Sequence, residues 1–121
     1  MPSRGDIVLA RFPFTDQRGA TLRPVLVLAE IPGRYADFLV VFISSRLSQA
    51  MGDLDVILDA AHPAFPGSGL RVPSVVRIAK VASISEQLIV GRLGGLDQTI
   101  LDEITRRLTH VIRTGRPPAG T

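Results

Sequence analysis

An arginine followed directly by a proline, Arg23-Pro24, is the first pair in the sequence that could do chemistry. Proline lacks a backbone N–H and tends to occupy strand starts or edges, and it restricts the preceding residue to extended geometry. The pair therefore predicts a guanidinium held at the boundary between a loop and a strand. Such a guanidinium can bind a phosphate through two parallel hydrogen bonds. Taken alone, an ordinary exposed arginine before a strand is the commoner explanation.

Two further segments carry groups that could bind a nucleic acid. Ser44 and Ser45 end an apolar segment, where their hydroxyls could bind phosphate or ribose or could simply cap the strand. Arg77 lies in a predicted strand and Lys80 lies shortly after it, and both could line a groove that tracks a phosphate backbone. Solvated strand charges are the alternative explanation for that second pair.

Other chemistries find less support. Asp53, Asp55 and Asp59 could suggest a metal site, but Asp53 and Asp55 lie at a strand start with no histidine nearby, so we interpret the three as a solvated face and predict no metal or cofactor. His62 and His110 have no serine or carboxylate at the spacing of a catalytic triad. The chain has no cysteine, which excludes disulfides and thiol catalysis and fits a reducing compartment.

The composition favours one soluble domain. The chain has 121 residues, 45% of them apolar, and a formal net charge of +3. Thirteen of its 14 basic residues are arginine and only Lys80 is lysine, which suits phosphate recognition but could also reflect codon usage. The N-terminus has no long apolar stretch and no segment approaches about 18 apolar residues, so we expect a cytoplasmic protein without a membrane span.

Short apolar segments separated by proline and glycine predict about seven strands. Strands at this spacing are typical of a small barrel or sandwich. The predicted strands are Asp6–Phe12, Pro24–Glu30, Phe38–Ser44, Leu54–Leu58, Ser74–Ile78, Ala82–Ile84 and Leu88–Leu93. The third of these has no polar face, so either the fold covers both of its faces or a second copy of the chain covers one.

A helix is predicted to close the domain. Asp97 can cap its start and Gly115 can end it. Apolar residues recur between them at helical spacing, at Ile100, Leu101, Ile104, Leu108, Val111 and Ile112. We therefore expect a single domain over residues 1–114 and a flexible tail over residues 115–121.

The order of these motifs resembles the MazF/PemK/Kid toxin family. The resemblance runs from about Arg4 to Ile112. It is carried by Arg4-Gly5-Asp6-Ile7-Val8-Leu9, Phe12-Pro13-Phe14-Thr15, Arg23-Pro24-Val25-Leu26-Val27-Leu28, Ile43-Ser44-Ser45, Pro73-Ser74-Val75-Val76-Arg77 and Gly91-Arg92-Leu93. It implies a mainly β, SH3-like β-barrel with a C-terminal α-helix, usually a homodimer. It also implies a metal-independent, sequence-selective endoribonuclease that cuts mRNA and is held inactive by an antitoxin protein.

The resemblance also implies roles for particular residues. Arg23 and Ser44 match the family's catalytic arginine and strand-end hydroxyl, and Arg77 matches a position used in some members. The chain departs from the family at Ala79, where an aspartate is common, and at Ser44, where threonine is common. An acid–base role for that aspartate therefore cannot be carried over.

We combine these observations into one hypothesis. The RNA 2′-hydroxyl attacks the neighbouring phosphate, Arg23 stabilises the charge that develops, Ser44 orients the phosphate or ribose, and Asp16 is the candidate general base. Residues assigned to RNA binding are Thr15, Arg18, Ser45, Arg46, Arg77 and Lys80. We expect the antitoxin to bring an acidic segment that orders on binding.

Two alternatives stay open. A toxin of the same barrel class could act without catalysis, by binding a protein target such as DNA gyrase. A nuclease could instead depend on a metal held by Asp53, Asp55 and Asp59.

Overall fold

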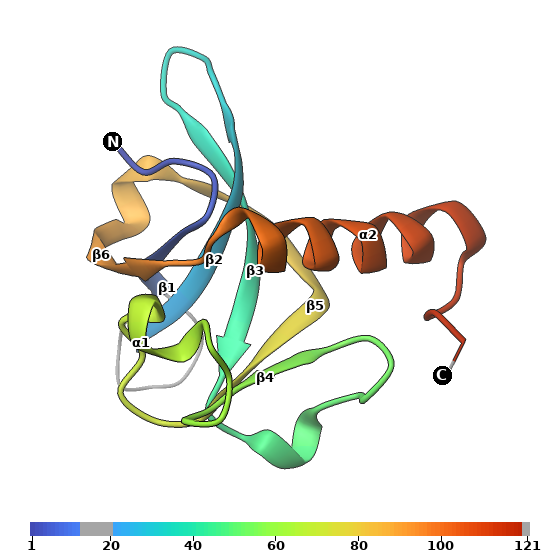
Figure 1. Ribbon diagram of the computed structural model, residues 1–121. Helices are drawn as coiled ribbons and strands as arrows, with labels where there is room; N and C mark the ends of the chain where they lie inside the picture. The colour runs from blue at the N-terminus through green and yellow to red at the C-terminus, as the bar shows by residue number, and fades with distance from the viewer. Residues whose placement is uncertain (13–20, 120–121) are drawn as a thin grey trace.

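The computed structural model describes residues 1–12 and 21–119. Within these ranges, six strands form one antiparallel sheet in the order β4-β5-β3-β2-β1-β6, and a long helix crosses it (Figure 1). The strands are β1 (Asp6–Phe12), β2 (Thr21–Ile31), β3 (Asp37–Ser44), β4 (Val56–Leu58), β5 (Ser74–Ser85) and β6 (Ile89–Gly95). The helices are α1 (Phe65–Ser68), α2 (Gln98–Thr114) and two 3-10 turns, η1 (Leu47–Gln49) and η2 (Glu86–Leu88). The mainly β class with a C-terminal helix is confirmed.

The sheet is strongly curled. β5 and β6 are consecutive in the chain but lie four strand positions apart in the sheet, which is about 19 Å along a flat sheet. The three residues of η2 join them, and a 3-10 turn of that length advances only about 8 Å between its flanking residues. The sheet must therefore bend back on itself. It does not close, because β4 and β6 remain its two edges in the described ranges, so "barrel" is a loose description.

One predicted break in the sheet is wrong. The segments Ser74–Ile78 and Ala82–Ile84 belong to a single strand, β5, which gives six strands in the described ranges and not seven. The register of β5 against β3 shifts across residues 78–80, so the strand bends there without ending. The bend is held by a hydrogen bond of 3.0 Å from the backbone N–H of Ile78 to Oδ1 of Asp55.

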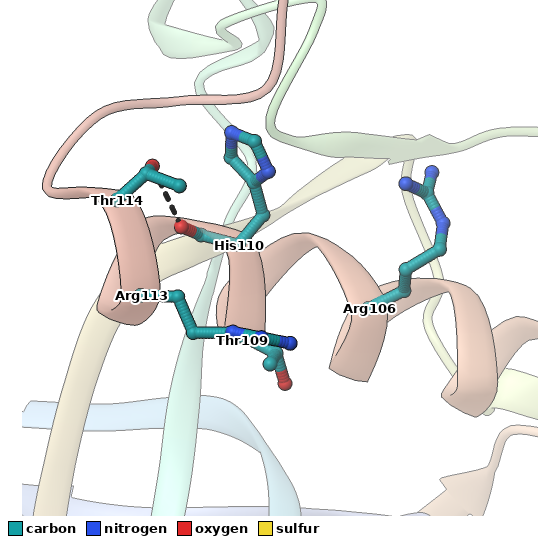
Figure 2. A pocket seen from close by; sticks show the side chains of 5 residues that line it. All are labelled: Arg106, Thr109, His110, Arg113 and Thr114. Carbon is teal, nitrogen blue, oxygen red and sulfur yellow. Dashed lines mark hydrogen bonds between the residues drawn. The ribbon is translucent and has the colours of Figure 1, made fainter.

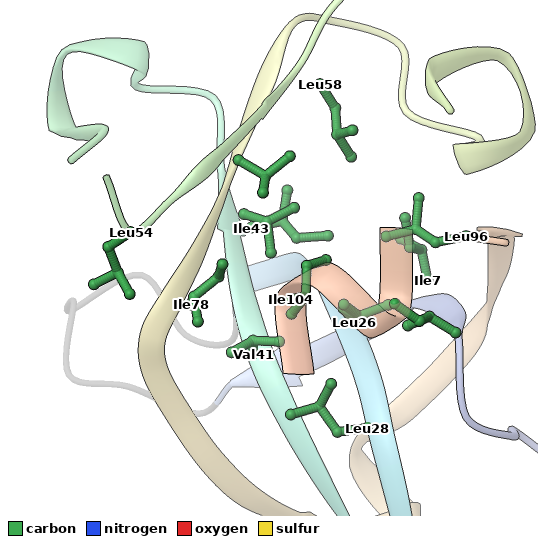
Figure 3. Close-up of a cluster of buried hydrophobic side chains, with 13 residues drawn as sticks. Ile7, Leu26, Leu28, Val41, Ile43, Leu54, Leu58, Ile78, Leu96 and Ile104 are labelled. Atoms are coloured by element: carbon green, nitrogen blue, oxygen red, sulfur yellow. The ribbon is translucent and has the colours of Figure 1, made fainter. Parts of the chain in front are cut away.

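Two hydrophobic clusters cover the two faces of the central strands. The first lies under α2 and is drawn in Figure 3. It comprises Ile7, Leu26, Leu28, Val41, Ile43, Leu54, Val56, Leu58, Val76, Ile78, Leu96, Leu101 and Ile104. The second comprises Val8, Ala10, Phe12, Val25, Val27, Ala36, Phe38, Val40 and Ile84. Val40 and Val41 point to opposite clusters and both are fully buried, which confirms that the fold itself covers both faces of β3.

The predicted ends of the long helix are confirmed. Oδ1 of Asp97 accepts a hydrogen bond of 3.1 Å from the backbone N–H of Ile100, and Gly115 ends α2 with a left-handed φ of 76°. No helix in the described ranges is long and apolar enough to cross a membrane.

Charged side chains fasten α2 to the loop before β4. The guanidinium of Arg107 donates to the carbonyl oxygens of Leu54 and Asp55, at 3.2 and 3.0 Å. Glu103 holds Arg107 in place, since its carboxylate accepts from Nε of Arg107 and Nη2 of Arg106, both at 2.7 Å. Hydrogen bonds from these two arginines lower the pKa of Glu103 to about 2.

We expect the Glu103→Gln variant to remove a pH-dependent part of the stability. The pKa of Glu103 is lower in the folded protein than its ordinary value of 4.5. Its ionised form therefore stabilises the fold fully above about pH 4.5, and this contribution disappears as the pH falls through about 2. Urea unfolding across this pH range should show wild type and Glu103→Gln converging at low pH. A constant difference at every pH would contradict this assignment.

Candidate functional site

A groove opens at one end of the sheet, where β2 and β3 separate. The two strands pair from Val25 and Phe42 onward, and the register does not continue to Pro24. Pro24 therefore has a strand neighbour, β1, on one side only, which is where a strand tolerates proline. The space between the diverging strands has a volume of about 460 Å³. Its lining residues are Leu9, Leu22, Arg23, Pro24, Ile43, Ser44, Ser45, Gly69, Leu70, Arg71, Val72, Ser74 and Leu93.

The position of Arg23 differs slightly from the prediction. β2 begins at Thr21, so Arg23 is the third residue of the strand and lies opposite Ala10 of β1, not at a loop boundary. The backbone geometry is nevertheless extended, as the following proline requires. Arg23 is therefore presented into the groove from a strand that β1 holds in register.

The charge of the groove is positive. Arg23 and Arg71 both line it and are exposed, and within residues 1–12 and 21–119 neither forms an ion pair. The part of the chain that the structure describes adds no aspartate or glutamate to this lining. Two unneutralised guanidinium groups facing one groove attract an anion such as phosphate.

The part of the groove lining that comes from the segment after α1 is built of backbone packed on backbone. Gly69 follows α1 with a left-handed φ of 75°, and a Cβ there would overlap the carbonyl oxygen of Leu93 in β6. A Cβ on Gly94 would likewise overlap the backbone of Ser68. Both positions therefore require glycine, and the segment that carries Leu70 and Arg71 is fixed against β6.

Ser44 stands at the end of β3 and makes two hydrogen bonds. Its hydroxyl donates to Oε1 of Gln49 at 3.2 Å, and its oxygen accepts from the backbone N–H of Arg46 at 3.1 Å. Ser45 also lines the groove and is exposed. Ser44 is consequently held by the 3-10 turn that follows β3.

Arg77 lies behind Ser44 and is bound to a buried carboxylate. Its Nε donates to Oδ2 of Asp55 at 3.2 Å, and its Nη1 donates to Oε1 of Gln49 at 3.1 Å. The Asp55 side chain is only 2% exposed and also accepts from the backbone N–H groups of Met51 and Ile78. The interpretation of Asp55 as part of a solvated face is therefore wrong: the carboxylate is a buried, fully bonded anchor.

The structure brings together only some of the residues proposed for the site. Arg23, Ser44 and Ser45 share the groove. Arg46 is exposed beside it, and Lys80 is exposed in the irregular part of β5, but neither belongs to the lining. Three further candidates, Thr15, Asp16 and Arg18, lie outside the described residues.

Sequence reasoning missed two residues of the site, Arg71 and Gln49. Arg71 precedes β5, and β5 is the antiparallel neighbour of β3. The entrance to β5 therefore meets the end of β3. The only signal in the sequence was that Arg71 lies two residues before a proline, Pro73, whereas Arg23 directly precedes Pro24. Gln49 carries no such signal, because its role depends on how η1 folds back towards β3.

The described residues contain no group of three or more histidine, aspartate or glutamate side chains close enough to hold a metal ion. Asp55 is occupied by Arg77, and Asp59 accepts a hydrogen bond from the backbone N–H of Ala61. The three aspartates considered as a metal site therefore do not converge.

A second hollow, of about 450 Å³, lies along α2. Figure 2 shows its lining residues, Arg106, Thr109, His110, Arg113 and Thr114, which all project from successive turns of this one helix. Thr114 Oγ1 donates to the carbonyl oxygen of His110 at 2.8 Å. No serine or carboxylate lines this hollow, so His110 has no partner there for a catalytic triad.

Comparisons with known proteins agree with this architecture. A family model described as "PemK-like, MazF-like toxin of type II toxin-antitoxin system" matches residues 3–112. Among solved structures, an endoribonuclease in complex with its cognate antitoxin from Mycobacterial species is similar with a TM-score of 0.63 and 15% identity, over 97% of this chain and 100% of that one. An endoribonuclease from Mycobacterial species has a TM-score of 0.63 and 14% identity, over 96% and 95%. Comparison with curated protein sequences finds no significant match.

We expect Asp55→Asn to destabilise the protein by about 2–3 kcal/mol, because it removes the charge that the partly exposed Arg77 and two backbone donors require. Urea unfolding measures the loss. Asp53→Asn is the matched control: Asp53 is exposed two residues away, and its substitution should change stability by less than about 0.5 kcal/mol. Equal effects of the two substitutions would contradict the anchoring role.

Proposed function

Because the chain belongs to the PemK-like, MazF-like toxin family of type II toxin–antitoxin systems, we propose that it is an endoribonuclease that cuts single-stranded mRNA without a metal ion. The observation that carries the proposal is the groove between β2 and β3, which Arg23, Arg71 and Ser44 line together and to which the described residues contribute no acidic side chain. The two similar structures, which are described as endoribonucleases, support the same activity.

The proposed reaction uses the substrate's own nucleophile. The ribose 2′-oxygen forms a bond to the adjacent phosphorus, the bond from phosphorus to the 5′-oxygen breaks, and a 2′,3′-cyclic phosphate and a 5′-hydroxyl result. A base takes the proton of the 2′-hydroxyl, and an acid supplies one to the leaving oxygen. Negative charge builds up on the phosphate oxygens, and preorganised donors beside them lower the barrier.

Arg23 is the residue we assign to that charge. It projects from a strand held in register by β1, and it has no ion-pair partner among the described residues that would have to be displaced. Arg71 lines the same groove and suits a neighbouring phosphate of the same RNA strand. Asp16 remains our candidate for the general base.

Two protein partners belong to the proposal. A groove that carries Arg23 and Arg71, with no acidic side chain from the described residues, is complementary to an acidic segment, so we propose an antitoxin that inserts such a segment and competes with RNA. We also propose that the active toxin is a homodimer, as the family resemblance implies, although the apolar strand β3 does not require a second copy to cover it.

We expect Arg23→Ala to lower the cleavage rate by about 10²–10³-fold, because it removes one preorganised donor to the developing charge. The assay incubates the purified protein with a long single-stranded RNA in EDTA and follows the fragments. Arg34→Ala is the matched control, since Arg34 is exposed in the turn between β2 and β3, at the other end of the strands. A folded Arg23→Ala protein that cuts at the wild-type rate would contradict the assignment.

The same assay tests the alternatives. Cleavage at a short recurring motif in EDTA supports the proposal. Loss of cleavage in EDTA would favour a metal-dependent nuclease, and RNA that stays intact with and without metal would favour a toxin that acts by binding a protein such as DNA gyrase.

We expect Arg71→Ala to weaken RNA binding and to make it less sensitive to salt. For a single-stranded nucleic acid, each phosphate contact contributes about 0.7 to the steepness of log affinity against log salt concentration. A variant that loses one contact should therefore show a slope that is shallower by about 0.7. Binding of a short single-stranded RNA at several salt concentrations measures the slope, and Arg34→Ala should leave it unchanged. An unaltered slope in Arg71→Ala would contradict a phosphate contact at this position.

A further inference from the structure

The hydroxyl of Ser44 ends a chain of hydrogen bonds whose direction is fixed. The chain starts at the Asp55 carboxylate, which accepts from Arg77, and continues from Arg77 to Gln49 and from Gln49 to Ser44. An ionised carboxylate can only accept hydrogen bonds and a guanidinium can only donate them. The two end groups therefore decide which way each intermediate group must face.

Gln49 has no choice of orientation. An amide presents either its oxygen or its NH₂ group, and these can be exchanged by a flip. Because Nη1 of Arg77 can only donate, the group that meets it at 3.1 Å must be the oxygen, Oε1. The same oxygen lies 3.2 Å from Ser44 Oγ, so Ser44 must supply the proton of that bond.

The number of further hydrogen bonds that the Ser44 hydroxyl can make follows from the bonds it already makes. A hydroxyl has one proton and two acceptor positions. The proton is directed to Gln49, and one acceptor position is filled by the backbone N–H of Arg46 at 3.1 Å. Among the contacts of the described residues, one acceptor position is left on Ser44, which lines the groove. Ser44 is therefore prepared to receive a hydrogen bond from a ligand and not to give one.

We propose that Ser44, held as an acceptor by Gln49, receives a hydrogen bond from a ribose 2′-hydroxyl and so distinguishes RNA from DNA. In the backbone of a nucleic acid, the phosphate and ring oxygens can only accept, and the 2′-hydroxyl is the group that can donate. It is also the group by which a protein tells RNA from DNA at a given position. The proposal rests on the proposed function only in taking single-stranded RNA as the ligand.

This assignment separates the roles of three residues. Ser44 contacts the sugar of the substrate, and Arg23 contacts the phosphate. Gln49 is a positioning residue that acts through Ser44, and it is itself oriented by Arg77. Nε and Nη1 of Arg77 donate within the protein, to Asp55 and Gln49, so Arg77 acts on Ser44 through Gln49.

The experiment measures a ratio of affinities in Arg23→Ala protein, in which RNA should survive the measurement. The two ligands are a short single-stranded transcript and the same transcript made with 2′-fluoro nucleotides, which lack the 2′ donor. We expect the RNA to bind about fivefold more tightly, the effect of one net hydrogen bond. Adding Ser44→Ala should bring the ratio close to one.

Two variants at Gln49 test the positioning role. Gln49→Ala frees the proton of Ser44 and should also reduce the ratio towards one. Gln49→Glu retains an acceptor oxygen for both Arg77 and Ser44, so it should retain the ratio. The added negative charge of Gln49→Glu weakens the binding of both ligands by the same factor, so it leaves the ratio of their affinities unchanged. Ser48→Ala is the control, because Ser48 is exposed in the same turn and should leave the ratio unchanged.

The outcomes separate this inference from the proposed function. If RNA and 2′-fluoro RNA bind equally well to the protein with Ser44 intact, this inference is wrong and the proposed function is unaffected. The open acceptor of Ser44 would then receive a hydrogen bond from another donor, such as a base amino group. A ratio that survives Ser44→Ala, or that survives Gln49→Ala, would also overturn the inference. Failure to bind either transcript would contradict the proposed function and this inference with it.

Discussion

The buried carboxylate of Asp55 accepts hydrogen bonds from three parts of the chain: the loop before β4, the bend of β5 and the side chain of Arg77. A negative charge removed from water is tolerated only when its acceptor positions are filled. Each bond therefore has a structural consequence. The loop is closed, β5 bends at residues 78–80 without ending, and Arg77 is turned towards the strand end that carries Ser44. The buried charge of Asp55 thus determines both the bend of β5 and the orientation of the side chains behind Ser44.

The groove itself results from sheet geometry. β2 and β3 are paired along most of their length and part at Arg23-Pro24 and Ser44-Ser45. Each strand keeps its other neighbour, since β1 still holds β2 and β5 still holds β3. The two walls are therefore supported by ladders on their outer sides and leave their inner sides open. An arginine and a hydroxyl can then line one groove from rigid strands, which holds both groups in place before any ligand arrives.

Much of this arrangement could be predicted from the sequence. The strand at Asp6–Phe12, the helix from Asp97 to Gly115 and the convergence of Arg23 with Ser44 follow from local patterns and from the order of motifs. The continuous β5 could not be predicted, because Ala79 and Lys80 interrupt the apolar pattern and the bond that carries the strand past them comes from Asp55, more than 20 residues earlier. The burial of Asp55 and the role of Gln49 were missed for the same reason: each depends on a partner that only the folded chain supplies.

The contact between the glycines of the α1 segment and β6 has a consequence for how the groove can respond to a ligand. On that side backbone meets backbone, with no side chain between them that could change rotamer. Packed backbone of this kind is nearly incompressible. This side of the groove is therefore rigid. A ligand that is too wide cannot enter by displacing the backbone there. Adjustment to a ligand must therefore come from the long side chains of Arg23 and Arg71. The rigid backbone limits the width of ligand that the groove accepts, while the two mobile arginine side chains can follow small differences in where its negative charges lie.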